Sequence, residues 1–280
     1  MEKPFSQEML QRLLAGVAFV SRAVYLPSAA STNDALKRMA AEGAPEGTLI
    51  VADEQTAGRG RLDRRWIALP GSSLLLSILF RPTAGAKHLP DSLCRGEKSP
   101  QANASPLHLT MVCSLAARDA IREVLGLEIA LKWPNDLVHE GRKLGGILTE
   151  IAGDSEPVQH AVVGIGINAN WDPSAAEFDQ PATSLSNLAG RSIPRGELLR
   201  GIVAAVAERY AALRAGASPA KEWEAALETV GQSVTVQSPT GILEGVATGV
   251  DADGALLVRS ADGQVHRVVA GDVRVRSPRR

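Results

Sequence analysis

Two apolar runs, TLIVADE at 48–54 and SLLLSILFR at 73–81, constrain the fold of this chain more than any other feature of its sequence. Both are rich enough in apolar residues to be buried strands, and their lengths suit strands rather than helices. We therefore expect them to belong to one sheet. The segment between them, EQTAGRGRLDRRW at 54–66, is then a loop that a rigid scaffold holds in place.

Periodic segments surround these strands. The residues at 107–126 and 195–214 have apolar side chains at helical spacing, which predicts two packed helices, and a shorter helix is expected at about 219–229. Further apolar runs, EIALKWP, KLGGILTEIAG and QHAVVGIGINAN, continue the sheet. The pattern predicts an α/β core with a mixed sheet.

Two segments stand apart from that core. Residues 83–106 are rich in Gly, Pro, Ser, Ala and charge, and a structureless loop of this length is uncommon in a compact domain, so we expect a mobile insertion. From Gly231 onward, short alternating runs are separated by DADG and ADG, which are hairpin turns, and this predicts a small β-barrel or sandwich. The expected domains are 1–229 and 230–277.

Composition excludes several classes of protein. With 280 residues, 45% of them hydrophobic, the chain can bury a sizeable core. No stretch approaches the roughly 20 apolar residues of a membrane span, and the amino terminus does not read as a signal peptide, so the default location is cytoplasmic. Cys94 and Cys113 are too few for a disulfide framework or a multi-cysteine zinc site. A net charge of -1 lacks the excess of positive charge that is typical of nucleic-acid-binding proteins.

The arginine-rich loop has two interpretations. Blocks of charge are often only a solvated surface. However, Gly58 and Gly60 permit close approaches, and the guanidinium groups around them offer forked donors that suit phosphate and carboxylate oxygens. This favours a loop that closes over a polyanion. The P-loop spacing is absent, so a nucleotide must be held in a different way.

Two more features lie at strand ends. Lys132 ends a strand just before Trp133 and Pro134, which leaves its ammonium at the rim of the sheet, although a single Lys there is more often a surface charge. Gly164 and Gly166 interrupt an apolar strand, where glycine marks the close approach of a ligand or a backbone, or a bulge.

Together these segments resemble the biotin protein ligase family, which attaches biotin to a lysine of a carboxyl-carrier domain. The matching motifs occur in the family's order: STN (31–33), EQTAGRGRLDRRW (54–66), LKWPNDL (131–137), KLGGILTE (143–150), GIGINAN (164–170) and the closing AGDVRVRS. The resemblance covers about 23–277, apart from 83–106. It implies a mixed-sheet α/β catalytic domain of the biotin/lipoate ligase type, which is similar to class II synthetases, and a small carboxy-terminal SH3-like β-barrel.

The resemblance also implies a reaction. Biotin and MgATP first give biotinyl-5'-adenylate and pyrophosphate, and an acceptor lysine then attacks the activated carbonyl while AMP leaves. Lys132 and Arg61 are the expected catalytic residues. Arginines and magnesium would offset the repulsion between a carboxylate and a triphosphate.

Site residues carry over motif by motif. The residues implied to bind biotin are Ser31, Thr32, Asn33, Gln55, Gly58, Arg59, Gly60, Arg61, Lys132, Gly146 and Gly164. Those implied to bind ATP or the adenylate are Arg61, Arg64, Trp66, Lys132 and Asn168. Ser31 or Thr32 can also cap a helix, and Asp136 and Lys143 can form a structural ion pair. No resident metal is expected, because magnesium would be held mainly by the ATP phosphates.

The implied partner is the biotin carboxyl-carrier domain of acetyl-CoA carboxylase or a related carboxylase, and the family allows a homodimer. Only about 25 residues precede the catalytic motifs, so we expect a ligase without the DNA-binding module that some members carry. No histidine lies in the motifs, which leaves the general base unassigned. The alternatives are a lipoate-type ligase and a non-catalytic binding regulator.

Overall fold

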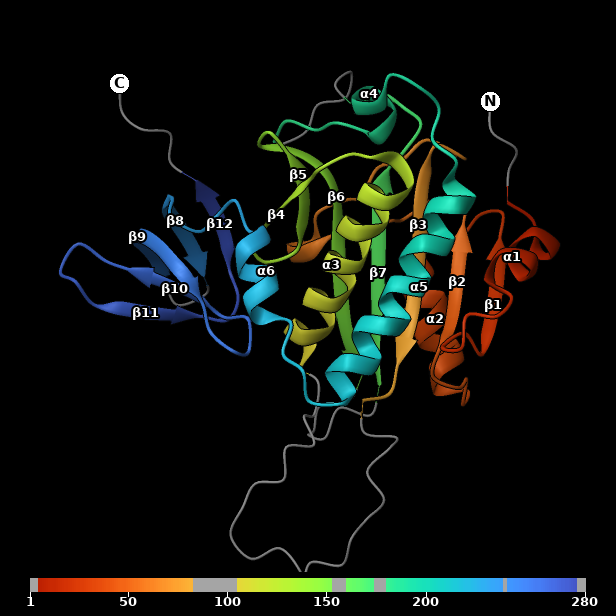
Figure 1. Cartoon of the computed structure of the whole chain (residues 1–280), viewed down its shortest axis with the longest axis horizontal. Helices are drawn as coiled ribbons and strands as arrows, with labels where there is room; N and C mark the ends of the chain where they lie inside the picture. The colour runs from red at the N-terminus through yellow and green to blue at the C-terminus, as the bar shows by residue number, and fades with distance from the viewer. Residues whose placement is uncertain (1–4, 83–104, 153–159, 174–179, 239–240, 276–280) are drawn as a thin grey trace, which may run out of the picture.

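The computed structural model describes residues 5–82, 105–152, 160–173, 180–238 and 241–275. They form a seven-stranded sheet that helices cover and a separate five-stranded sheet, which lies beside it in Figure 1. The insertion expected at 83–106 falls outside the described residues, except for residues 105 and 106. The boundary expected at residue 230 stays a prediction.

The larger sheet is mixed, as the sequence predicts. Its strands are β1 (Arg22–Leu26), β2 (Thr48–Ala52), β3 (Ser73–Phe80), β4 (Ala130–Lys132), β5 (Asp136–His139), β6 (Arg142–Ala152) and β7 (His160–Asn168). They lie in the order β1-β2-β3-β7-β6-β5-β4, with β1 parallel to β2 and the other neighbours antiparallel. The expected strands at 48–54 and 73–81 are β2 and β3. They pair with each other, which confirms that the arginine-rich loop connects them.

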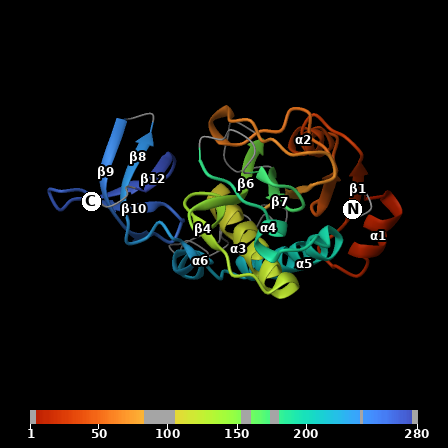
Figure 2. The same cartoon turned by 90° about the horizontal axis from the view of Figure 1, so that it is seen from above.

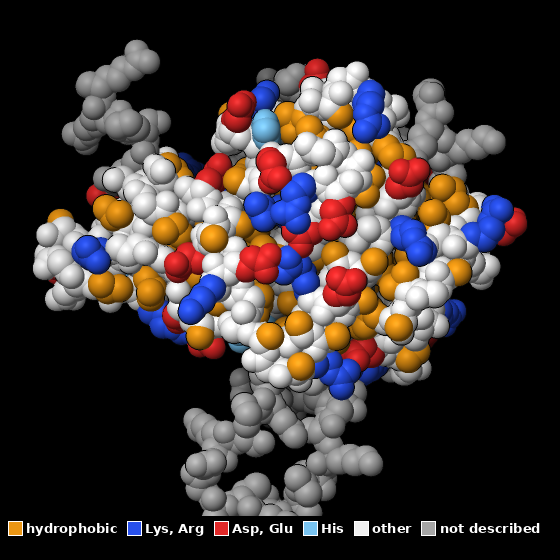
Figure 3. Space-filling view, viewed as in Figure 1, with side chains coloured by type: hydrophobic (Ala, Val, Ile, Leu, Met, Phe, Trp, Pro, Cys, Tyr) orange, Lys and Arg blue, Asp and Glu red, His pale blue; other side chains and the backbone are white. Residues whose placement is uncertain are grey.

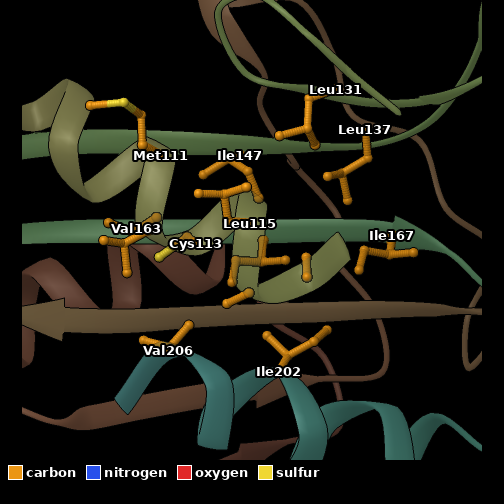
Figure 4. Packing of buried hydrophobic residues seen from close by; sticks show 14 of the residues in the cluster. Met111, Cys113, Leu115, Leu131, Leu137, Ile147, Val163, Ile167, Ile202 and Val206 are labelled. Atoms are coloured by element: carbon orange, nitrogen blue, oxygen red, sulfur yellow. The ribbon is translucent and has the colours of Figure 1, made fainter. Parts of the chain in front are cut away.

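Helices cover both faces of this sheet (Figure 2). On one face lie α3 (Pro106–Leu125) and α5 (Arg195–Arg214), and on the other lies α2 (Thr32–Ala41). Leu49 and Val51 of β2 belong to the core cluster under α3 and α5, whereas Ile50 belongs to the cluster under α2. Figure 4 shows side chains of α3, α5 and the sheet meeting in the larger cluster. Burial on both faces explains why these strands are almost wholly apolar.

Local sequence sets the helix ends. Ser105 caps α3 by accepting a hydrogen bond from the His108 backbone N–H at 3.2 Å, and Gly126 ends it in the left-handed region with φ of 68°. The expectation for 219–229 was wrong at its end. There α6 covers only Ala220–Ala226, because Leu227 pairs with Leu131 of β4 instead.

Three shorter elements complete the helices: α1 (Gln7–Leu14), α4 (Leu185–Ala189) and the 3-10 turn η1 (Arg61–Asp63). None of the described helices combines the length and the hydropathy that a membrane span requires. Figure 3 shows Lys and Arg side chains interspersed with Asp and Glu on the face that carries α3 and α5. This fits the nearly neutral charge of the sequence.

The smaller sheet is antiparallel throughout. Its strands are β8 (Ser233–Ser238), β9 (Gly241–Val250), β10 (Leu256–Arg259), β11 (Val265–Val268) and β12 (Asp272–Val275), in the order β11-β10-β9-β8-β12. The two turns predicted from DADG and ADG join β9 to β10 and β10 to β11, and Gly254 and Gly263 there have φ of 86° and 85°. The small carboxy-terminal β-domain is therefore confirmed.

A buried charged cluster ties the arginine-rich loop to the core. Arg195, 1% exposed, is the first residue of α5, and its Nη1 lies 2.9 Å from Asp53 Oδ1 and 3.1 Å from the Ser73 carbonyl oxygen. The other Asp53 oxygen accepts hydrogen bonds from the Tyr25 hydroxyl and the Phe5 backbone N–H. Burial and the Asp53 contact raise the pKa of Tyr25 to about 12. Because Asp53 and Ser73 flank the loop, one guanidinium holds both of its stems.

We predict that Arg195→Met lowers the free energy of unfolding by about 3–5 kcal/mol, because it leaves the Asp53 carboxylate buried without its cation. Denaturant titration followed by tryptophan fluorescence measures this loss. Combining the change with Asp53→Asn should recover part of the stability, since the uncompensated charge is then gone.

The matched control is Arg191→Met, which removes an exposed arginine four positions earlier in the chain. Its effect should stay within about 0.5 kcal/mol. Equal stabilities of the Arg191 and Arg195 variants would show that the buried pair does not hold the loop stems.

Candidate active site

A cavity of about 1190 Å³ is lined by residues of both sheets and of the arginine-rich loop. Pockets for drug-sized molecules measure roughly 300–1,000 Å³, so this cavity has room for a large ligand or for two small ones. Thirteen of the expected site residues line it: Ser31, Thr32, Asn33, Gln55, Arg59, Gly60, Arg61, Arg64, Trp66, Lys132, Gly146, Gly164 and Asn168. Gly58 is not among the lining residues.

The arginine-rich loop is folded back on itself. The Gly60 backbone N–H donates to the Arg64 carbonyl at 2.7 Å, and the Trp66 N–H donates to the Gly58 carbonyl at 2.9 Å. A Cβ atom added to Gly58 would lie 2.9 Å from the Trp66 carbonyl oxygen, which is too close for any other residue. Gly58 therefore serves the closure of the loop.

Arg59 is fastened to the larger sheet and to α2. Its guanidinium lies 2.6 Å from Asp34 and 3.5 Å from Glu150, and Lys37 lies 2.8 Å from each of the same two carboxylates. The hydrogen bond from Arg59 is the main cause that lowers the pKa of Asp34. Two cations and two carboxylates thus form one network at this edge of the cavity.

Arg61 and Arg64 are fastened to the smaller sheet. Arg61 donates to the Gly271 carbonyl at 3.1 Å and to Asn135 at 3.4 Å, and burial lowers its pKa. Arg64 makes two hydrogen bonds to the Asp272 carboxylate, at 2.6 and 3.2 Å. Arg64 holds the pKa of Asp272 below its ordinary value. The ion pair therefore persists at neutral pH and is lost only as the pH falls through that lowered pKa.

A hydrogen-bonded network of Thr32, Asn33 and Gln55 forms what we call the polar floor of the cavity. The Gln55 side-chain oxygen accepts hydrogen bonds from the N–H and the hydroxyl of Thr32, at 2.8 and 2.9 Å. Ser77 Oγ lies 2.7 Å from the Thr32 hydroxyl and 2.6 Å from Asn33 Oδ1, and the Asn33 amide donates to Glu150 at 2.7 Å. Sequence reasoning missed Ser77 and Glu150, which orient the residues that line the cavity.

The glycines of β7 allow close approach. A Cβ atom at Gly164 would lie 2.5 Å from Asn33 Oδ1, and one at Gly166 would lie 3.0 Å from the Trp66 ring. The alternative of a bulge is wrong, because β7 pairs with β3 and β6 in unbroken register. The Trp66 indole N–H is buried and has no hydrogen-bond partner among the described residues.

Several residues that the motifs single out also have structural roles. Ser31 caps α2 by accepting a hydrogen bond from the Asp34 N–H at 3.4 Å. Lys143 and Asp136 form an ion pair at 2.6 Å. The buried Asn168 amide donates to the Thr183 carbonyl at 3.1 Å and so supports the end of β7.

Lys132 is the last residue of β4, at the rim of the sheet, as its position before Trp133 and Pro134 predicts. It forms no salt bridge with any residue that the structure describes. Its ammonium adds to the lining of the cavity a positive charge that no salt bridge with the described residues neutralises.

The smaller sheet and the segment leading to it also line the cavity. Sequence reasoning assigned no role to these residues, which are Glu228, Gln232, Asp272, Val273, Arg274 and Val275. The motif AGDVRVRS was the available signal for β12. Nothing in the local sequence marks Glu228, because only the pairing of distant segments brings it to the site.

Family models match both parts of the chain. The biotin/lipoate A/B protein ligase family model matches residues 25–168, and the model of the biotin protein ligase C-terminal domain matches residues 229–276. The chain belongs to the biotin/lipoate A/B protein ligase family. The resemblance read from the motifs is thereby confirmed, and so is the fold class that it implied.

Individual members of this family are similar over most of their length. The bifunctional ligase/repressor BirA of Bacillus subtilis is 33% identical over 254 residues, which are 89% of this chain and 73% of that protein. The biotin–acetyl-CoA-carboxylase ligase of Mycobacterium tuberculosis is 32% identical over 87% of this chain and 85% of its own. The biotin protein ligase of Aquifex aeolicus, solved in complex with biotin and ATP, is 26% identical with a TM-score of 0.74, covering 92% of this chain and all of that one.

We predict that Asp272→Asn releases the arginine-rich loop, because the neutral amide cannot hold Arg64 in a charge-assisted pair. Limited trypsin digestion should then cut the chain several-fold faster within residues 59–65, with the sites identified by mass spectrometry. The control is Asp262→Asn, in the exposed turn between β10 and β11 of the same sheet. Equal cleavage rates in the two variants would contradict a role for Asp272 in holding the loop.

Proposed function

We propose that this chain ligates biotin to a lysine of a biotin carboxyl-carrier domain through biotinyl-5'-adenylate. The observation that carries the proposal is that one cavity gathers Lys132, five arginines and a hydrogen-bonded polar floor in a member of this ligase family. In the first step a biotin carboxylate oxygen attacks the α-phosphorus of ATP, and pyrophosphate leaves. In the second, the acceptor amine attacks the biotinyl carbonyl, and AMP leaves.

Electrostatics is the main demand of the first step. A carboxylate must approach a triphosphate, so two like charges meet, and fixed cations lower the barrier by stabilising the charge that develops. Lys132 and Arg61 line the same cavity, and we propose them as the catalytic residues. Arg61 is partly buried, which strengthens its field because less water screens it.

We propose that biotin binds over the polar floor. Its ureido ring needs donors and acceptors in a mostly apolar pocket, and Thr32, Asn33 and Gln55 supply hydroxyl and amide groups that their own network holds in place. The remaining proposed contacts are Ser31, Arg59, Gly60, Arg61, Lys132, Gly146 and Gly164, with Gly58 shaping the loop above them.

We propose that the adenylate lies against Trp66, Asn168, Arg61, Arg64 and Lys132. An aromatic ring that packs on Gly166 offers a flat face for a base, and the arginines suit phosphate oxygens. The described residues hold no group of three His, Cys, Asp or Glu side chains able to bind a metal ion. We propose that Mg²⁺ enters with ATP and takes most of its ligands from the phosphates and water.

The partner and the setting are part of the proposal. The carrier would be the biotinylated subunit of acetyl-CoA carboxylase or a related carboxylase, as the names of the relatives suggest. A homodimer and a cytoplasmic location are proposed with it. The loop that Arg64 fastens to β12 would shield the adenylate, which is a mixed anhydride, from water.

Lys132→Ala should abolish most of the ligation, because it removes the cation nearest the reacting groups in this proposal; we expect a rate at least about 100-fold lower. The purified chain is incubated with biotin, MgATP and an isolated biotin carboxyl-carrier domain, and mass spectrometry follows the gain of one biotinyl group. Lys221→Ala, which removes an exposed lysine of α6, is the control and should ligate at the wild-type rate.

Omitting ATP should prevent the mass gain, and lipoate in place of biotin should give none. A chain that binds biotin but never modifies the carrier would overturn the proposal in favour of a binding regulator. Modification by lipoate alone would overturn it in favour of a lipoate ligase.

We predict that Gly164→Ala weakens biotin binding at least about 10-fold, because the added methyl group would lie 2.5 Å from Asn33 Oδ1 and displace that amide from the floor. Isothermal titration calorimetry measures the affinity. Gly201→Ala adds the same group to α5, outside the cavity lining and 3.2 Å from Ala120 Cβ, and should leave the biotin affinity unchanged. Equal losses in both variants would contradict the proposed place of biotin.

A further inference from the structure

The residue that follows α6 forms an isolated parallel bridge with β4. Leu227 pairs with Leu131, and the Glu228 backbone N–H donates to the Leu131 carbonyl at 2.9 Å. One residue further, the Thr229 hydroxyl accepts a hydrogen bond from the Trp133 N–H at 3.0 Å. These contacts fix the register of the two segments.

That register places Glu228 next to Lys132. Neighbouring residues in a parallel pair point to the same face, and successive residues alternate between faces. Leu131 and Leu227 both join the core cluster, and Lys132 and Glu228 both line the cavity. A carboxylate and an ammonium therefore reach the reaction site side by side.

Glu228 differs from the other acidic groups of the cavity. Of the three carboxylates that line it within the described residues, Asp136 is paired with Lys143 at 2.6 Å and Asp272 with Arg64 at 2.6 Å. Glu228 makes no salt bridge within 4.0 Å in the part of the chain that the structure describes. Because no ion pair with the described residues neutralises the Glu228 carboxylate, it is the one of the three best able to accept a proton.

The surroundings of Glu228 suit that task. Partial burial raises its pKa, while Lys132 and the Gly141 backbone amide act in the opposite direction. A carboxylate with a raised pKa holds a proton more firmly and is a better base near neutral pH. Besides Lys132, the other charged groups that line the cavity are the Asp136–Lys143 and Arg64–Asp272 pairs, Arg59, Arg61, Arg65 and Arg274.

We propose that Glu228 is the general base of the second step and accepts a proton from the acceptor lysine. The inference rests on the ligase reaction proposed above. The ammonium gives one proton to the Glu228 carboxylate, and the freed amine forms a C–N bond to the biotinyl carbonyl. The bond between that carbonyl carbon and the phosphate oxygen breaks, AMP leaves with the electron pair, and the second proton of the nitrogen passes to solvent.

The first step needs no such base. Biotin attacks as a carboxylate, which carries no proton at neutral pH, so only the second step depends on proton removal. A general base and a group that merely positions Lys132 therefore affect different steps. Positioning Lys132 would change both of them.

The test is Glu228→Gln, which keeps the shape of the side chain and removes the base. Adenylate formation is followed by the biotin-dependent release of pyrophosphate, and transfer by single-turnover mixing of the preformed adenylate complex with the carrier domain. We expect adenylate formation to stay within about 2-fold of wild type and transfer to fall about 100-fold at pH 7. The deficit should shrink as the pH rises towards about 10.4, where lysine deprotonates unaided.

Two further variants sharpen the result. Glu228→Asp retains a carboxylate and should recover much of the transfer rate. Glu140→Gln makes the same chemical change at an exposed carboxylate beside Gly141, outside the cavity lining, and should leave both steps at the wild-type rate. Because adenylate formation reports an intact site, it also shows that each variant is folded.

Equal loss of both steps in Glu228→Gln would overturn the proposal and make Glu228 a positioning residue for Lys132. An unchanged transfer rate, or a deficit that does not shrink at high pH, would overturn it as well. Failure of the wild-type chain to form any adenylate is a different result, which would overturn the ligase function itself.

Discussion

Several positive charges line one cavity, and the rest of the structure has to offset their mutual repulsion. Three arginines of the loop meet oxygen atoms of other elements: Arg59 meets α2 and β6, whereas Arg61 and Arg64 meet β12 and the residue before it. These contacts offset the repulsion and also fix the loop in space. Lys132 forms no salt bridge with the described residues, and its charge is directed into the cavity beside Glu228.

A rigid base is needed for that arrangement, because a loop of flexible glycines does not position charges by itself. The strands on either side of the loop are buried on both faces, and Arg195 binds both stems from within the core. Glycines at 164 and 166 then let Asn33 and Trp66 approach the sheet more closely than any side chain would allow. The chain thus combines a stiff sheet with a closely packed floor.

The sequence predicts those parts of the fold whose signals are local. Long apolar runs and helical periodicity give β2, β3, α3 and α5 almost to the residue, and turn residues give the hairpins of the smaller sheet. Two short strands, β1 and β5, escape because each is brief and only partly buried. The site motifs contain most of the lining residues, Asp272 of AGDVRVRS among them. The roles of Ser77, Asp272 and Glu228 escape because they come from pairings between distant segments, which no local pattern records.

The end of β4 connects the cavity, the core and the smaller sheet. Lys132 faces the cavity, and Trp133, 1% exposed, turns into the core, where its backbone N–H binds Thr229 and its indole donates to the Gly254 carbonyl of the smaller sheet at 3.0 Å. Trp133 therefore joins the end of β4 to the segment carrying Glu228, through its backbone, and to the smaller sheet, through its indole. Because the smaller sheet in turn holds Arg61 and Arg64, it is a structural part of the site, and a displacement of Trp133 would reach Lys132, Glu228 and both of these arginines.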